Sequence, residues 1–261
     1  MKDVLASGQR DRLARFAWSS TLVGLDFDGT LAPIVARPED AELRPRTREL
    51  LAALARAYPV AVLSGRARDD VSARLRGIPL RAIIGNHGLE PSRALDRCRR
   101  VVTRWTPVLE AALASEPGVE IEDKTYSLAI HFRRARMRRA AHARILAAIA
   151  RLDGPPRVVG GKLVVNVLPP GAPHKGIALL RLRDALRADT AIYVGDDVTD
   201  EDVFALDDPG RLLSIRVGAG RRSAAPFYLR SQAAIDELLE TLVALRKRIG
   251  HRVRDGGLLP P

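Results

Sequence analysis

Short apolar runs that end in a polar residue recur in the first and last thirds of the chain. Three of them, 21–26 (TLVGLD), 59–64 (PVAVLS) and 190–196 (TAIYVGD), are typical of buried β-strands. Helical patterns lie between or after them, at 47–57, 67–76, 175–187 and 200–206. This alternation predicts an α/β core with a doubly wound parallel sheet. In such a sheet, polar residues at the carboxyl ends of the strands meet at one crevice.

The middle of the chain has a different rhythm. Its pattern predicts a helix, a strand pair, a second helix and a second strand pair about Gly161, over 97–114, 119–124 with 127–133, 137–152, and 157–160 with 162–168. This order is that of an α+β cap domain inserted into the core. Pro91 and Pro169-Pro170-Gly171 mark its hinges. We therefore expect core segments over 1–91 and 171–250, the cap over 92–170, and a flexible tail over 251–261.

Composition narrows the class of protein. The 261 residues are 46% hydrophobic and 28% charged, which suits a globular fold with a substantial core. The net charge of +12 could attract a nucleic acid. However, the arginines of the chain are spread along the predicted helices, and aromatic residues, on which bases could stack, make up only 4% of the chain. No apolar run approaches membrane-spanning length. We expect a cytoplasmic monomer with neither nucleic acid nor membrane as a partner.

The cysteine count limits the kind of metal site. Cys98 is the only cysteine, so neither an intrachain disulfide nor a cysteine-based zinc cluster can form. A metal here must use oxygen ligands or the five histidines. Asp26-Phe27-Asp28-Gly29-Thr30 places two carboxylates at a strand end, which is costly unless a cation such as Mg²⁺ neutralises them. Thr30 and the amides after Gly29 can donate to phosphate, although an aspartate-capped turn would also fit this segment alone.

Three more segments carry candidate chemistry. Ser64-Gly65-Arg66 leaves a strand with a hydroxyl and a glycine, and His174-Lys175-Gly176 begins a helix. Alone, the second could be an ordinary surface lysine. The segment 195–202 (GDDVTDED) has five acids among the seven residues from Asp196 to Asp202. A solvated helix start would explain the last three acids but not Asp196 and Asp197, which follow a buried strand.

The order of these four segments resembles that of the haloacid dehalogenase superfamily of phosphatases. The resemblance implies that Asp26 is the nucleophile, Asp28 the general acid and base, Ser64 a phosphate ligand and Lys175 the neutralising charge. It also implies Mg²⁺ bound by Asp26, by the carbonyl of Asp28 and by Asp196, with Asp197 and Asp200 behind these ligands. Elementary chemistry agrees, because a carboxylate attacking phosphorus needs positive charge to offset the repulsion.

Across most of its length the chain resembles the trehalose-6-phosphate phosphatase family. The residues that carry this are LDFDGTLAPIV (25–35), LSGR (63–66), GNHGLE (85–90), VEIEDKTYSLAIHFR (119–133), GGKLVVNVLPP (160–170) and GDDVTDEDVF (195–204). The resemblance implies a sugar phosphate held by core and cap residues: Thr30, Gly65, Arg66, Asn86, His87, Glu122, Lys124, His131, Lys162 and Asn166. The chain has only five lysines and two asparagines, so their presence in this set favours a function over a solvated strand face. A satisfied core histidine is the alternative for His131.

The chain departs from the family at one place. Asn166-Val167-Leu168-Pro169 stands where the family usually has glutamate, valine, arginine and proline. Asn166 can still exchange hydrogen bonds with sugar hydroxyls, but Leu168 cannot replace an arginine. Two alternatives therefore stay open. One is the same reaction on sucrose phosphate or a glycosyl phosphoglycerate, and the other is a catalytically silent regulator that binds sugar phosphate.

Overall fold

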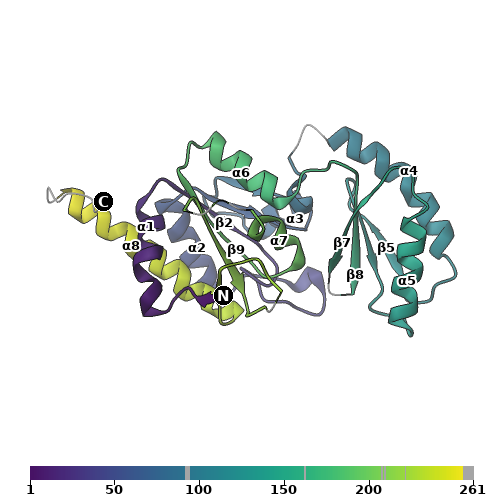
Figure 1. Cartoon of the computed structure of the whole chain (residues 1–261), viewed down its shortest axis with the longest axis horizontal. Coiled ribbons are helices and arrows are strands. Elements are labelled where there is room, and N and C mark those ends of the chain that lie inside the picture. Colours follow the sequence, from purple (N-terminus) through teal and green to yellow (C-terminus); the bar gives the residue numbers. More distant parts are fainter. Residues whose placement is uncertain (92–94, 162, 207, 209, 221, 255–261) are drawn as a thin grey trace.

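Two β-sheets of different kinds organise the chain (Figure 1). The structure, a computed structural model, describes residues 1–91, 95–161, 163–206, 208, 210–220 and 222–254. The larger sheet has seven strands in the order β1-β11-β10-β9-β2-β3-β4, and every pairing is parallel. Its strands are β1 (Lys2–Asp3), β2 (Thr21–Leu25), β3 (Val60–Leu63), β4 (Ala82–Ile84), β9 (Thr190–Gly195), β10 (Leu212–Val217) and β11 (Phe227–Leu229).

Helices cover both faces of this parallel sheet. One face packs against α1 (Arg10–Trp18), α2 (Pro45–Ala57), α3 (Arg68–Arg74) and α8 (Ile235–Arg254). The other packs against α6 (Lys175–Ala185) and α7 (Glu201–Phe204). Because both faces are covered, the central strands are buried along their whole length, which is why they read as apolar runs. The prediction of a doubly wound parallel-sheet core is confirmed.

The inserted unit has the predicted order of elements. It comprises α4 (Leu95–Leu113), β5 (Glu120–Asp123), β6 (Leu128–His131), α5 (Arg138–Ile149), β7 (Arg157–Gly161) and β8 (Val164–Leu168). Its sheet is antiparallel, in the order β5-β6-β8-β7. Alternation along the strands sends Leu128, Ile130, Val165 and Val167 into a cluster with the two helices. In Figure 1, α4 and α5 cover the side of this sheet that faces away from the core, so the opposite face turns toward the core.

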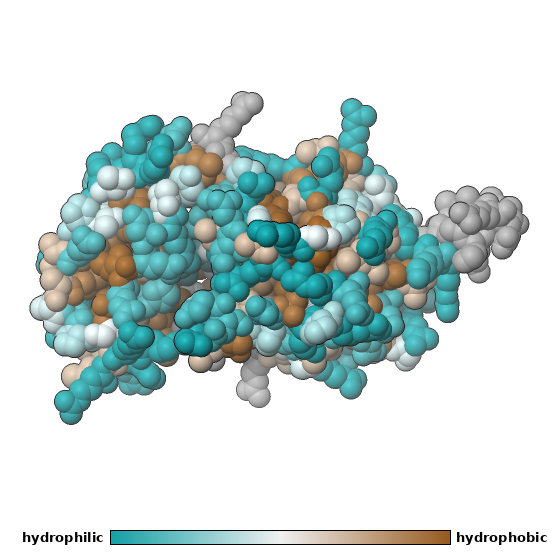
Figure 2. All heavy atoms as spheres, turned by 180° about the vertical axis from the view of Figure 1, so that it is seen from behind, coloured by the Kyte–Doolittle hydropathy of each residue, from teal (hydrophilic) through white to brown (hydrophobic). Residues whose placement is uncertain are grey.

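The surface and the carboxyl-terminal helix complete the picture. Hydrophilic residues cover most of the face shown in Figure 2, and hydrophobic ones appear there as separate patches. None of the helices in the described residues is long and apolar enough to cross a membrane. Helix α8 continues to Arg254, so residues 251–254, which we assigned to a flexible tail, are helical.

Candidate active site

Three neighbouring strands place polar residues at one edge of the parallel sheet. Asp26 follows β2, Ser64 follows β3 and Asp196 follows β9, and β2 pairs with both of the other strands. Asp26 is 4% exposed and Ser64 is fully buried. These segments, which are far apart in sequence, therefore meet in space as the parallel topology requires. Ser64 accepts a hydrogen bond from the backbone N–H of Arg66 at 3.1 Å, which turns the chain away from the strand.

Lys175 is a buried cation between two carboxylates. Its Nζ donates to Asp26 Oδ1 and to Asp200 Oδ1, each at 2.7 Å, and the residue is 1% exposed. Burial alone would lower the pKa of Lys175, but the charges of Asp200 and Asp26 raise it above its ordinary value. The lysine is therefore charged at neutral pH. It offers a fixed positive charge beside Asp26, at the N-terminus of α6.

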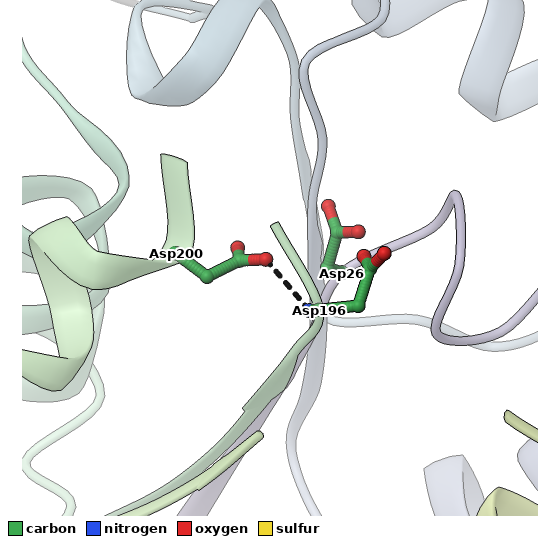
Figure 3. A group of neighbouring side chains, drawn as sticks. All are labelled: Asp26, Asp196 and Asp200. Carbon is green, nitrogen blue, oxygen red and sulfur yellow. Dashed lines mark hydrogen bonds between the residues drawn. The ribbon is translucent and has the colours of Figure 1, made fainter. Parts of the chain in front are cut away.

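Asp200 holds this lysine and the loop after β9. Besides Lys175, it accepts hydrogen bonds from Tyr193 Oη at 2.6 Å and from the amides of Asp196 and Asp197 at 2.9 Å each. Figure 3 shows its carboxylate reaching the strand end from the neighbouring helical segment. Both of its oxygens are thus occupied by protein donors. Asp197 caps the helical turn Val198–Asp200 by accepting the Val198 N–H at 2.7 Å.

Asp26 and Asp196 fit a divalent cation. Their carboxylates point to the same side of the strand ends (Figure 3), and with Asp200 they offer oxygen atoms within 4.8 Å of one another. Asp196 Oδ1 is buried and has no hydrogen-bond partner among the described residues. Burial, followed by Asp200 and Asp197, raises the pKa of Asp196 to about 7, and burial also raises the pKa of Asp26 well above its ordinary value. A cation with oxygen ligands would relieve this crowding.

The turn after Asp26 can only be made with glycine. Gly29 has φ +79°, and a Cβ there would lie 2.1 Å from Asp196 Oδ2. The turn closes through the Gly29 N–H, which donates to Ala32 O at 2.8 Å, and it is supported by Gln232 Nε2, which donates to Thr30 O at 2.9 Å. Thr30 Oγ1 is buried without a partner in the part of the chain that the structure describes.

Arg66 forms a bidentate ion pair with the carboxylate of Asp28. Its Nε and Nη2 donate to the two oxygens of Asp28 at 2.6 and 2.7 Å, a bidentate pairing. Further bonds run to Asp70 at 2.9 Å and to Pro38 O at 2.7 Å. The guanidinium that we expected on the sugar is thus committed to the carboxylate that we expected as general acid and base. Its sugar contact stays a prediction, and it would require part of this network to open.

Asn86 and His87 bring a core loop under the cap. Both have left-handed backbones, with φ of 47° and 58°, in the helical turn Asn86–Gly88. The side chain of Asn86 donates to Lys124 O at 3.4 Å and accepts from Ser127 Oγ at 3.3 Å. Burial, followed by the charges of Lys124 and Lys175, lowers the pKa of His87 well below its ordinary value. The ring is therefore neutral, and it can both donate to and accept from a hydroxyl.

The predicted cap residues lie on the face of the cap sheet that turns toward the core. Lys124 Nζ donates to Gly65 O at 3.3 Å and lies 4.0 Å from Glu122 Oε2. His131 Nε2 lies 2.8 Å from the same Glu122 oxygen, and this hydrogen bond lowers the pKa of Glu122. Asn166 is 6% exposed, with Nδ2 3.4 Å from Val159 O. Lys162, the remaining cap residue of the predicted set, lies outside the described residues.

Sequence reasoning missed supporting residues of the site. Tyr193 and Gln232 hold Asp200 and the turn after Asp26, and Asp70 shares Arg66 with Asp28. Tyr193 left a usable signal, because it is one of four tyrosines and stands between two aliphatic residues of a predicted buried strand. The other two left none. Gln232 reaches Thr30 across some 200 residues of chain, and no local pattern reports such a contact.

A parallel sheet with buried carboxylates and a buried lysine at its strand ends, interrupted by an α+β cap, is the fold of the haloacid dehalogenase class. A family model described as trehalose-phosphatase matches residues 24–232. The chain is 34% identical over 237 residues to a trehalose-phosphate phosphatase of Mycobacterium tuberculosis, which covers 84% of this chain. It therefore belongs to the trehalose-phosphatase family. The chain spans 60% of the length of that relative.

Solved structures agree with the fold. A trehalose-6-phosphate phosphatase related protein superposes with a TM-score of 0.69 at 26% identity, covering 87% of this chain and 99% of the other. The carboxyl-terminal domain of C. albicans trehalose-6-phosphate phosphatase gives 0.75 at 21% identity, with coverage of 91% and 96%. The second likeness speaks for the fold alone.

Proposed function

We propose that this protein hydrolyses trehalose 6-phosphate to trehalose and phosphate through an aspartyl-phosphate at Asp26, with Mg²⁺ as cofactor. The observation that carries the proposal is the placement of Asp26, buried at the end of β2 and 2.7 Å from the Lys175 ammonium. It lies beside Asp196, whose Oδ1 has no hydrogen-bond partner within the described part of the chain. The Lys175 ammonium therefore places a positive charge beside this carboxylate, where it can attract a phosphate group. Family membership supports the sugar.

The proposed reaction proceeds through two successive displacements at phosphorus. An oxygen of Asp26 attacks phosphorus, the bond from phosphorus to the sugar oxygen breaks, and Asp28 gives that oxygen a proton. Asp28 then takes a proton from water, whose oxygen attacks phosphorus and releases Asp26. Lys175 stays charged through both steps and offsets the negative charge that gathers on the phosphoryl oxygens. In this proposal the hydroxyls of Thr30 and Ser64 donate to these oxygens.

Asp26, Asp196 and the carbonyl of Asp28 would hold Mg²⁺, whose positive charge lowers the repulsion between nucleophile and phosphate. The pKa directions favour this assignment. Without a cation, Asp26 and Asp196 both resist ionisation because they are buried beside other acids. Asp200 is a poorer ligand, because four protein donors already use its oxygens. It keeps Lys175 and the loop after β9 in position.

Recognition of the sugar is assigned to the face of the cap that turns toward the core. Glu122, Lys124, His131 and Asn166 share this face, and His87 meets it from the core. These groups suit hydroxyls better than hydrocarbon packing. We also propose that the cap is bounded between residues 91 and 92 and between residues 170 and 171. A cytoplasmic location, a monomeric state and the lack of nucleic-acid or membrane partners stay predictions.

A panel assay tests the proposal. Phosphate release should be measured with trehalose 6-phosphate, sucrose phosphate, a glycosyl phosphoglycerate and p-nitrophenyl phosphate, each with Mg²⁺ and with chelator. We expect the highest kcat/KM with trehalose 6-phosphate and no turnover in chelator. A preference for another sugar phosphate would keep the reaction and overturn the substrate. Binding without turnover of any of them would favour the silent regulator.

A further inference from the structure

The cap and the core are joined by an ion pair that the proposed reaction does not use. Arg157 begins β7, the edge strand of the cap sheet, and its Nη2 donates to both carboxylate oxygens of Asp202 in α7. Within the described residues this is the one salt bridge between 95–168 and the rest of the chain. The two side chains are 30% and 22% exposed, so water reaches them only in part.

The register of the cap sheet explains why Arg157 faces the core. Arg157 lies opposite Leu168, and Val159, two residues along the same strand, lies opposite Asn166. Residues two apart on a strand share a face. Arg157 therefore stands on the same side as Asn166, the side turned toward the core. Any movement that lifts this face from the core must separate Arg157 from Asp202.

Asp202 stands next to the parts that hold the catalytic lysine. It follows Asp200, which accepts from Lys175, by two residues. Its carbonyl packs against Gly176 so closely that a Cβ there would lie 2.2 Å from the oxygen. Gly176 directly follows Lys175 at the start of α6. The cap arginine thus rests on the junction of α6 and α7, from which Lys175 reaches Asp26.

We propose that the Arg157–Asp202 ion pair is the latch that positions the cap over the active site, so that it acts on sugar-phosphate binding rather than on the chemical step. The inference rests on the proposed function for its substrate. A partly exposed pair suits this task, because its charges regain water when they separate and the cost of opening stays small. The cap can then open in every cycle to release product.

The first test compares variants on a large and a small substrate. Arg157→Gln should lower kcat/KM for trehalose 6-phosphate about tenfold, about 1.4 kcal/mol, mainly through KM. Turnover of p-nitrophenyl phosphate, which needs little from the cap, should change little. Arg134→Gln is the matched control, because its ion pair with Glu120 lies within the cap. The exchange of charges in Arg157→Asp with Asp202→Arg should recover most of the loss.

The second test needs no turnover. In small-angle scattering of the protein without substrate, Arg157→Gln should have a larger radius of gyration than the wild type, and Arg134→Gln should not. High salt should expand the wild type in the same way, because it screens the pair. Equal loss on both substrates, or unchanged scattering with unchanged KM, would overturn the latch. If the wild type hydrolysed no sugar phosphate, the proposed function would fail while the scattering still decided the latch.

Discussion

At the scale of single residues, buried charge in this protein is balanced locally around Asp26. Lys175 is the positive member, with Asp26 and Asp200 as its two partners, each at 2.7 Å. Removing one partner of such a group leaves the others buried without compensation. Lys175, to which we assign a role in the reaction, therefore also stabilises the site.

Replacing Lys175 should damage both stability and turnover. We expect Lys175→Ala to lose about 3–5 kcal/mol of folding free energy, as buried ion pairs do when one member is removed. Turnover should fall at least about tenfold, since a charged hydrogen bond contributes about 1.5–3 kcal/mol. Thermal melting and phosphate release measure the two effects. Lys247→Ala, an exposed lysine on α8, is the control and should change neither. Wild-type activity in Lys175→Ala would contradict the assigned role.

Arg66 offers a test that separates two roles. If it positions Asp28, Arg66→Met should lower kcat about equally for trehalose 6-phosphate and for an unactivated alkyl phosphate, by about tenfold or more. If it contacts only the sugar, the loss should fall on trehalose 6-phosphate alone. The bidentate geometry favours the first result. Steady-state kinetics on the two substrates decide between them, with Arg68→Met, at the start of α3, as a control.

The residues that carry chemistry were predictable where they lie in short motifs. Asp26, Ser64 and Asp196 each end an apolar run, and parallel topology brings such ends together. The grip of Arg66 on Asp28 was not predictable. The two residues are 38 positions apart, and the sequence pattern does not determine where the long arginine side chain points. Pairings of this kind are set by tertiary packing rather than by local order.

At the scale of elements, the cap sheet separates an apolar face from a polar one. Lys124→Ala and Asn166→Ala should therefore each lower kcat/KM for trehalose 6-phosphate at least about tenfold, about 1.4 kcal/mol, with little change on p-nitrophenyl phosphate. Equal losses on both substrates would show a role in the fold or the chemistry. Val158→Ala, an exposed residue on β7, is the control and should leave both rates unchanged.

Tyr58 ties α2 to two other helices and gives a pH dependence. Its hydroxyl donates to Leu242 O at 2.9 Å, with Ala17 O at 3.2 Å, and burial raises its pKa to about 12. Because the folded pKa is raised, this stabilisation is complete below pH 10 and is lost as pH rises from 10 toward 12. Tyr58→Phe should cost about 1 kcal/mol at neutral pH. Melting curves from pH 8 to 12 should show the difference from wild type shrinking above pH 10, and a constant difference would contradict the account.

Long elements were easier to predict than short ones. The central strands and the cap elements gave clear patterns, whereas β1, β4 and β11 have only two or three residues and so no measurable period. These short strands lie at or near the two edges of the sheet, where pairing with a neighbour rather than the sequence of the strand decides their structure. Helix α8 continues to Arg254, into the segment 251–261 that we expected, from its Arg, Gly and Pro content, to be a flexible tail.

At the scale of the whole molecule, an antiparallel cap is inserted into a parallel-sheet core, and in the proposed function the core transfers the phosphoryl group while the cap recognises the sugar. The core alone holds Asp26, Lys175 and Asp196, and the cap contributes Lys124 and Asn166 from the opposite side. This division explains why the reaction could be predicted more sharply than the substrate. The residues proposed for catalysis lie in motifs, whereas the proposed recognition of the sugar depends on how closely the cap and the core meet.

The central claim is that Asp26 becomes phosphorylated by trehalose 6-phosphate. The most direct measurement is to quench the enzyme during turnover with Mg²⁺, reduce it with borohydride, and locate the modified residue by peptide mass spectrometry. Reduction of an aspartyl-phosphate converts that aspartate to homoserine, and we predict the change at position 26, abolished in Asp26→Asn together with phosphate release. Homoserine at another position, or turnover that persists in Asp26→Asn, would contradict the account.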